Sequence, residues 1–244
     1  MNPHTTSPIS SAARKFVDSV LELRPRIAVF DCDGTLWDSD SGELFYRWEL
    51  ENSLLDERTA QWLRDRYASY KRGEVGEDDM CGEMVTVHAG LSVSDLERAV
   101  ARYFPEKVAP TIFPEMLILT RALAEQGCDL WAVSSTNDWV VREGIREFGI
   151  PADHVLAACV HCEDGVATDR LLRVPSGVGK ALAINEVVGT VPDAAFGNSI
   201  FDEAMLSLAR HSFAVNPNPD LETVAKQNGW TIYRPDPRPR PTDS

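Results

Sequence analysis

A short apolar run that ends in two aspartates constrains this chain more than any other feature. Residues 27–30 are all apolar, which is typical of a strand buried on both faces of a parallel sheet. Asp31 and Asp33 follow directly, and on an extended backbone such residues point to one side, about 6.6 Å apart. We therefore expect both carboxyl groups in one pocket beyond the carboxyl end of the strand, where open α/β sheets bind ligands. Two acids this close repel each other unless a cation or a proton separates them, so the pair indicates chemistry rather than a solvated turn.

Strand and helix patterns alternate from residue 114 onward. The expected strands are 129–133, 155–160, 194–196 and 213–215, and the expected helices are 115–126, 138–148, 180–188 and 203–209. A hairpin turn is expected at residues 163–165, and a packing helix at 11–23 precedes the first strand. This alternation predicts an α/β fold with a doubly wound parallel sheet.

The segment between these two parts, residues 38–110, has the pattern of about four amphipathic helices. Its apolar residues recur at helical spacing, and turns are expected near Gly73, Gly76 and Gly90. Short helices bury their apolar faces only against each other, so we expect a small helical cap domain. The predicted organisation is a core of residues 1–37 and 111–234, a cap of residues 38–110, and a flexible tail of residues 235–244.

Composition limits the possible partners. A formal net charge of −14 argues against nucleic acid, since binding a phosphate backbone requires clustered lysine and arginine. No signal peptide or membrane-spanning run is present, so no membrane partner is expected. The odd number of cysteines, five, favours a reducing, cytoplasmic location. Cys159 and Cys162 have the spacing of metal ligands but lack a second pair, so we interpret them as strand and turn residues.

Three further groups of polar residues are expected at the same edge of the sheet as the two aspartates. Ser134 follows one predicted strand, Asn198 and Asp202 follow another, and Lys180 begins a helix. Carboxyl ends of parallel strands meet at one edge, so these side chains should converge. Each has an alternative role, because Ser134 or Asp202 could cap a helix and Lys180 could be a solvated surface residue.

In this order, the motifs resemble those of the haloacid dehalogenase superfamily of phosphohydrolases. Residues 31–35 are similar to its first motif and Ser134 to its second, while Lys180 fits the third and residues 197–202 the fourth. The helical insertion directly after the first motif resembles the C1-type cap of the phosphoserine-phosphatase-like branch. The resemblance extends over residues 27–233 and implies a Rossmannoid core with a helical cap.

The resemblance also implies a role for each residue. Asp31 would be the nucleophile that forms an aspartyl-phosphate, Asp33 the general acid and base, and Lys180 the group that neutralises the developing charge. The implied phosphate-binding residues are Gly34, Thr35, Ser134, Ser135 and Lys180. Mg²⁺ is the implied cofactor, with Asp31, Asp33, Asn198 and Asp202 as the implied metal-binding residues.

Asn198 departs from the family pattern, which usually has an aspartate at this position. An amide oxygen can bind magnesium, but it removes one negative charge from the site. We therefore expect weaker metal affinity, with Asp202 moving inward to compensate.

Acidic and aromatic residues alternate where the chain leaves the first strand for the cap. Asp40 falls where phosphoserine phosphatases have a glutamate that meets the substrate's ammonium group. Asp40 and Glu43, together with Trp37 and Tyr46, could hold an amine by charge and cation–π contact. Alternatively, the aromatic residues form the cap's core and the acids belong to a solvated linker.

The function expected from the sequence is magnesium-dependent hydrolysis of a small phosphomonoester, possibly one that carries an amine, such as phosphoserine or phosphocholine. One alternative is phosphoryl transfer to an acceptor other than water, as in a mutase. The other is a non-catalytic protein that binds a phosphorylated metabolite, which the weakened metal site at Asn198 would favour. The sequence predicts no particular oligomeric state.

Overall fold

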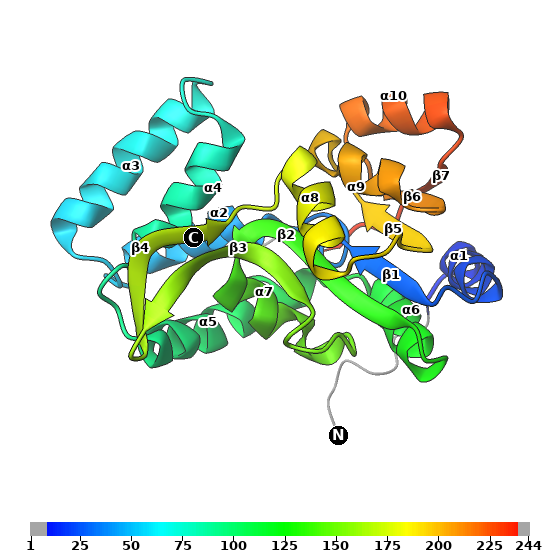
Figure 1. Ribbon diagram of the computed structural model, residues 1–244, viewed down its shortest axis with the longest axis horizontal. Coiled ribbons are helices and arrows are strands. Elements are labelled where there is room, and N and C mark those ends of the chain that lie inside the picture. Colours follow the sequence, from blue (N-terminus) through cyan, green and yellow to red (C-terminus); the bar gives the residue numbers. More distant parts are fainter. Residues whose placement is uncertain (1–8, 239–244) are drawn as a thin grey trace.

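The computed structural model describes residues 9–238 and is built around a seven-stranded sheet with the order β4-β3-β2-β1-β5-β6-β7 (Figure 1). The strands are β1 (Ile27–Phe30), β2 (Asp129–Asn137), β3 (Val155–Glu163), β4 (Val166–Arg173), β5 (Ala194–Gly197), β6 (His211–Val215) and β7 (Thr231–Tyr233). All neighbouring strands run parallel except β3 and β4. The strand that directly precedes the two aspartates, β1, therefore lies at the centre, with β2 and β5 on either side.

Helices cover both faces of the sheet, which confirms the doubly wound α/β fold. On one face lie α1 (Ser11–Glu22), α6 (Pro114–Glu125) and α7 (Asp138–Gly144), and on the other α8 (Val178–Val187), α9 (Glu203–Leu208) and α10 (Pro219–Asn228). Successive side chains of β1 point to opposite faces of the sheet and therefore belong to two different apolar clusters. Ala28 and Phe30 pack toward the first group, and Val29 packs toward the second.

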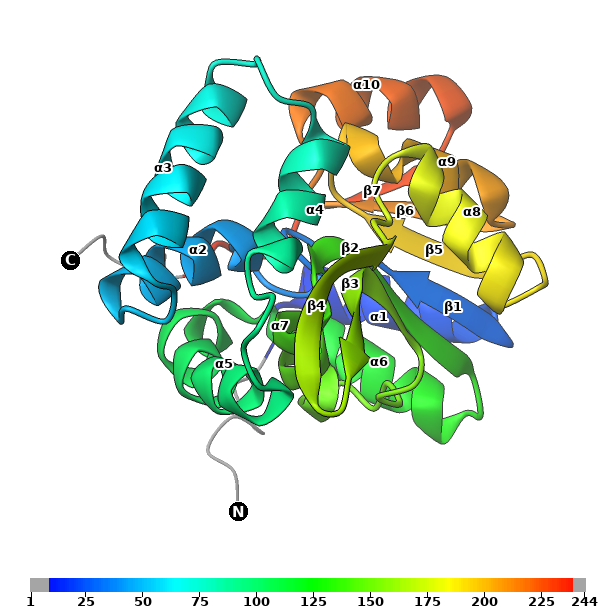
Figure 2. The ribbon, with the colours of Figure 1, turned by 60° about the vertical axis from the view of Figure 1, so that its left-hand side comes forward.

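The four helices expected in residues 38–110 are present as α2 (Ser41–Glu51), α3 (Glu57–Lys71), α4 (Glu77–Thr86) and α5 (Val93–Lys107). They do not form a self-contained bundle. Side chains of α2 and α5, including Phe45 and Tyr103, join the large apolar cluster beside the sheet. A separate cluster contains Leu63 and Met80, from α3 and α4. Figure 2 shows α3 projecting away from the sheet, whereas α4 reaches the sheet at one end, where Val85 joins the large cluster.

The hairpin formed by β3 and β4 connects the cap to the sheet through hydrogen bonds. Its turn contains Asp164 and Gly165, both with positive φ (49° and 77°), as expected for a two-residue hairpin turn. The loop between α4 and α5 bonds to the outer edge of β4. Gly90 N donates to Ala167 O at 2.8 Å, and Ala167 N donates to Leu91 O at 2.9 Å. These bonds cover part of the exposed edge of the sheet.

Several boundaries differ from the sequence expectation. The expected helix 138–148 divides into α7 and a 3₁₀ turn, η2 (Ile145–Glu147), and two further 3₁₀ turns are η1 (Ala109–Thr111) and η3 (Ile200–Asp202). Strand β7 and helix α10 have no counterpart in that expectation. Tyr233 of β7 stacks on Phe16 of α1 with ring centroids 3.8 Å apart, which fixes the end of the core. Of the predicted flexible tail, residues 239–244 lie outside the described residues.

The sequence also led to expectations about membrane-spanning segments and about the cysteines. Within residues 9–238, no helix combines the length and apolarity that a bilayer crossing requires. All five cysteines lie in this range and are free thiols. Cys159 lies in β3 as expected, and Cys162, expected in the turn, also belongs to this longer strand.

Candidate active site

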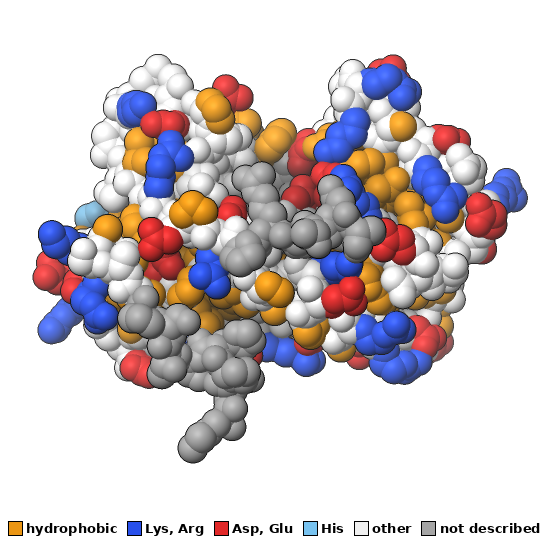
Figure 3. Space-filling view, turned by 180° about the vertical axis from the view of Figure 1, so that it is seen from behind, with side chains coloured by type: hydrophobic (Ala, Val, Ile, Leu, Met, Phe, Trp, Pro, Cys, Tyr) orange, Lys and Arg blue, Asp and Glu red, His pale blue; other side chains and the backbone are white. Residues whose placement is uncertain are grey.

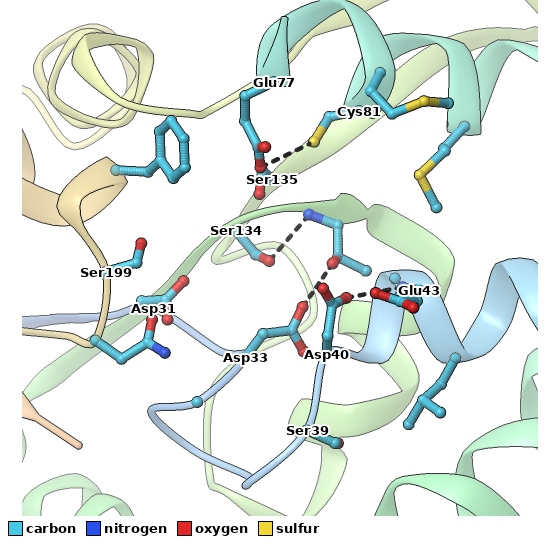
Figure 4. Close-up of a pocket in the computed structure, with 18 of the residues that line it drawn as sticks. Asp31, Asp33, Ser39, Asp40, Glu43, Glu77, Cys81, Ser134, Ser135 and Ser199 are labelled. Carbon is cyan, nitrogen blue, oxygen red and sulfur yellow. Dashed lines mark hydrogen bonds between the residues drawn. The ribbon is translucent and has the colours of Figure 1, made fainter. Parts of the chain in front are cut away.

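A pocket of about 720 Å³ lies between the carboxyl ends of the central strands and the cap helices (Figure 4). The core contributes Asp31, Asp33, Ser134, Ser135, Lys180 and Asn198, and the cap side contributes Asp40, Glu43, Tyr67, Tyr70 and Glu77. Acidic side chains are visible in the hollow between the two lobes (Figure 3). The structure thus brings the four sequence motifs together at one edge of the sheet.

Asp31 sits at the end of β1 with both carboxylate oxygens engaged. Its side chain is buried, Lys180 Nζ lies 2.6 Å from Oδ1, and Thr35 donates its hydroxyl to Oδ2 at 2.8 Å. Burial, assisted by the charge of Asp202, raises the pKa of Asp31 to about 7, although Lys180 opposes this shift. A buried side chain held at both oxygens has a fixed orientation at the edge of the pocket.

Lys180 lies between two carboxylates. It is the third residue of α8, is only 3% exposed, and donates to Asp31 and to Asp202 at 2.6 Å each. Burial alone would lower the pKa of Lys180, but Asp202 and Asp31 raise it above its usual value. The ammonium group is therefore charged, and its burial rules out the alternative of a solvated surface lysine.

Asp202 is fully buried and does not line the pocket, so the expectation that it binds the metal is not retained. Its Oδ1 is occupied by Lys180, and its Oδ2 accepts the backbone N–H groups of Asn198 and Ser199 at 2.9 Å each. Asp202 instead orients Lys180 and the loop after β5.

Asp33 accepts bonds from four donors. Trp37 Nε1, Ser41 N and Ser41 Oγ bind its Oδ1 at 2.6, 2.8 and 2.6 Å. Thr136 Oγ1 binds its Oδ2 at 2.7 Å. Figure 4 shows Asp33 between Asp31 and Asp40, turned toward the cap side of the pocket.

The polar end of β2 places a hydroxyl opposite the two aspartates. Ser134 and Ser135 both line the pocket within β2, and Ser134 Oγ accepts a bond from Thr136 N at 3.2 Å. The N-cap of α7 is Asn137, whose Oδ1 accepts a bond from Val140 N at 3.0 Å. Ser134 is therefore not the helix cap that the alternative interpretation required.

The residues expected to hold Mg²⁺ fit a hard cation. Asp31 and Asn198 both line the pocket and offer a carboxylate and an amide oxygen, which are ligands that magnesium prefers. Gly34 makes room for Asn198, because a Cβ there would lie 1.8 Å from Asn198 Nδ2. Within residues 9–238, no cluster of three or more His, Cys, Asp or Glu side chains forms a metal site.

Three further expectations are corrected by burial. Trp37 and Tyr46 were candidates for substrate contact, but neither lines the pocket. Trp37 is completely buried, with its indole N–H on Asp33, and Tyr46 stacks on Tyr67 at 4.4 Å in the cap's core. Thr35 was a candidate for phosphate binding, but its buried hydroxyl is used by Asp31.

Glu43, the second acid proposed to bind an amine, is already paired. Arg47 Nη2 and Lys71 Nζ lie 2.6 and 2.9 Å from its two oxygens. Burial alone would raise the pKa of Glu43, but hydrogen bonds from Tyr67, Lys71 and Arg47 lower it to about 2. Asp40 thus remains as the stronger candidate of the two.

Sequence reasoning missed several pocket residues on the cap side. None of Tyr67, Tyr70 and Glu77 was a candidate from the sequence, yet all three line the pocket. Tyr70 donates its hydroxyl to Glu77, and Cys81 Sγ lies 3.6 Å from the same carboxylate. The available signal was that tyrosine combines an apolar body with a polar tip, which suits the boundary between core and cavity.

The fold, the position of the cap after β1 and the buried Asp31–Lys180 pair agree with the family motifs recognised in the sequence. The family model described as haloacid dehalogenase-like hydrolase matches residues 28–207. The chain belongs to this family.

Curated relatives and solved structures agree with this assignment. A histidinol-phosphatase of Neisseria meningitidis is 24% identical over 84% of this chain and 97% of its own length. The phosphoserine phosphatase SerB1 of Mycobacterium tuberculosis is 26% identical over 84% of this chain and 69% of its own. A Bordetella pertussis protein of unknown function superposes with a TM-score of 0.76 at 23% identity, covering 85% of this chain and 97% of its own. A phospho-aspartyl intermediate analogue of phosphoserine phosphatase reaches 0.55 at 18% identity, covering 87% and 94%.

Proposed function

We propose that this chain hydrolyses a small aminated phosphomonoester in a magnesium-dependent reaction, through an aspartyl-phosphate at Asp31. The observation that carries the proposal is the contact of Lys180 Nζ with Asp31 Oδ1 at 2.6 Å, in a pocket that Ser134 also lines. A nucleophilic carboxylate, a buried cation and a hydroxyl donor together suit a phosphoryl group that is being transferred.

The residues would act in sequence. An oxygen of Asp31 attacks phosphorus, while the Lys180 ammonium and the Ser134 hydroxyl stabilise the negative charge on the phosphoryl oxygens. Asp33 gives a proton to the leaving alkoxide and later takes one from the attacking water. Mg²⁺, when bound, would be held by Asp31, Asn198 and the backbone carbonyl of Asp33, and would supply positive charge beside the phosphate.

The charge of the pocket supports a substrate that carries its own positive group. Among residues 9–238, six carboxylates and two basic residues line the pocket, so an anion without a compensating charge is repelled. Asp40 and Glu77 accept bonds from neutral donors, the backbone N–H of Glu43 and the hydroxyl of Tyr70. Relatives named histidinol-phosphatase and phosphoserine phosphatase support an aminated substrate as well.

The first experiment measures phosphate release from p-nitrophenyl phosphate, with and without magnesium. We expect metal-dependent release that Asp31→Asn lowers by at least about 10³-fold. Asp78→Asn, on the exposed first turn of α4, removes one carboxylate without touching the pocket and serves as the control. Binding of phosphate without release would instead support a non-catalytic role, and transfer to an added alcohol in preference to water would support a phosphotransferase.

The second experiment compares phosphocholine, phosphoserine and glycerol phosphate. A cationic group near Asp40 should make the first two better substrates than glycerol phosphate, and Asp40→Asn should reduce that preference. Equal rates on all three would contradict the aminated substrate while leaving the hydrolysis intact.

A further inference from the structure

The two oxygens of Asp33 face different surroundings. Oδ1 is bound by Trp37 and Ser41, which are completely buried and do not line the pocket. Oδ2 is bound by the hydroxyl of Thr136, which does line the pocket. Oδ2 is therefore the oxygen on the side of the substrate.

Two of the three donors on Oδ1 are N–H groups, whereas the third, Ser41 Oγ, and the donor on Oδ2, Thr136 Oγ1, are hydroxyls. An indole N–H and a backbone N–H can only donate, so the bonds from Trp37 and Ser41 leave no place for a proton on Oδ1. The Thr136 hydroxyl can donate or accept, so it can accept a proton carried by Oδ2. A neutral Asp33 in this setting carries its proton on the pocket side alone.

We infer that Thr136 is a positioning residue that aims the acid proton of Asp33 from Oδ2 toward the leaving group, with Trp37 and Ser41 excluding that proton from Oδ1. This inference rests on the proposed hydrolysis. Gly42 of α2 leaves space for the Thr136 hydroxyl, because a Cβ at position 42 would lie 2.9 Å from Thr136 Oγ1.

Protons and electron pairs balance across the two half-reactions. The new bond from Asp31 to phosphorus forms as the bond to the leaving oxygen breaks, and that oxygen keeps the electron pair and takes the proton from Asp33 Oδ2. Asp33 is left as a carboxylate, and the Thr136 hydroxyl turns to donate to it. When water attacks phosphorus, the bond between phosphorus and the Asp31 oxygen breaks and Asp31 regains its carboxylate, while the proton of the water goes to the same Oδ2 of Asp33 and restores the acid.

Leaving-group dependence separates this role from a merely structural one. A p-nitrophenolate leaves without protonation, whereas the alkoxide of glycerol phosphate requires an acid. We expect Thr136→Val to lower kcat on glycerol phosphate by about 10- to 100-fold more than kcat on p-nitrophenyl phosphate. Thr136→Ser, which keeps the hydroxyl, should retain the ratio of the two rates. In an Asp33→Asn background, Thr136→Val should cause no further fall in that ratio.

Other outcomes count against the inference. Equal losses on both substrates, or a ratio that Thr136→Ser changes as much as Thr136→Val, would overturn it. If Thr136→Val does not fold, Gly42→Ala provides the same comparison, because its methyl group would displace the hydroxyl without removing it. Failure of the unaltered protein to release phosphate from either substrate would contradict the proposed function itself.

Discussion

Gly34 and Asn198 lie so close together that a Cβ on Gly34 would be 1.8 Å from Asn198 Nδ2. The loop after β1 and the loop after β5 are thereby fitted to each other, next to the pocket that both line. Gly34 also has φ +73°, a backbone conformation that only glycine adopts readily. The glycine of the first motif therefore serves two purposes, a left-handed turn and the close approach of a metal-ligand candidate.

Replacing Gly34 by alanine should displace the Asn198 amide and weaken metal binding. We expect the magnesium concentration for half-maximal activity to rise about 10-fold or more, because the added methyl group would overlap the amide. Gly73→Ala is the matched control. Gly73 has a similar φ of +75°, but a methyl group added there would meet nothing within 4 Å, so it shares only the backbone strain. Equal magnesium dependence in the two variants would contradict a role for this contact.

Asn198→Asp should tighten magnesium binding. The substitution restores one negative charge in a partly enclosed pocket, so the half-maximal magnesium concentration should fall about 10-fold. A titration of activity against magnesium measures this directly. Unchanged magnesium dependence would show that the side chain at this position does not contact the metal.

Glu49 and His88 form a fully buried pair within the cap, and His88 also contacts the core. His88 Nε2 lies 2.7 Å from Glu49 Oε2, and the imidazole packs edge-on against Trp139 of α7 at 5.6 Å. Glu49→Leu leaves the histidine without its partner and should lower the free energy of unfolding by about 3–5 kcal/mol, as His88→Leu should by leaving a buried carboxylate. The double variant should lose less than the sum of the two.

Urea unfolding of the single and double variants measures this coupling. Arg64→Gln, which breaks an exposed pair with Glu57 at 3.3 Å, is the control and should change stability little. Additive losses in the double variant would contradict an interaction between Glu49 and His88.

Asp40 should make the metal-free protein less stable as pH rises. Asp40 is accessible to solvent, but the surrounding pocket walls, together with repulsion from Asp33, raise its pKa from 3.8 to about 7. Between these two values the folded chain keeps a proton that the unfolded chain releases, so this contribution to stability is lost as pH rises through about 7. Solvent screening keeps the resulting effect on stability small. Asp31 has the same sign, with a pKa of about 7.

Melting temperatures without metal, from about pH 5 to pH 8, measure the effect. The fall across this range should be smaller in Asp40→Asn than in the unaltered protein. Asp78→Asn controls for the change in net charge and should leave the fall as it is. Identical slopes in all three proteins would show that Asp40 does not titrate in this way.

The fold could be predicted from local patterns because strands and helices here alternate with clear periodicity. The first motif, the apolar strand before it and the helical insertion after it were all readable from neighbours in the sequence. Strand β7 was missed because its three residues, Thr231–Tyr233, are too short to show a period. The packing of the cap was also missed, because an amphipathic face predicts burial without identifying its partner. Tyr103 of α5 lies in the core cluster, where its hydroxyl bonds to Ser41 O at 2.7 Å.

The candidate site was predictable in its residue types and less so in their contacts. Asp31, Lys180 and Ser134 converge as expected, since the ends of parallel strands meet at one edge. The positions of Trp37 and Asp202 in the chain predict contact with substrate and metal. Their side chains turn instead toward Asp33 and Lys180, because buried polar atoms must find partners and these lay closest.

The sequence by itself determined the class of fold, the family motifs and the edge of the sheet at which the polar residues gather. These follow from periodicity and from chemistry at fixed spacing along the chain. Only the tertiary structure decided which oxygen of Asp33 faces the pocket, which acids are already paired, and which aromatic residues reach the cavity. Those outcomes depend on side chains from distant segments, such as Thr136 beside Asp33, and no local pattern encodes the distance between them.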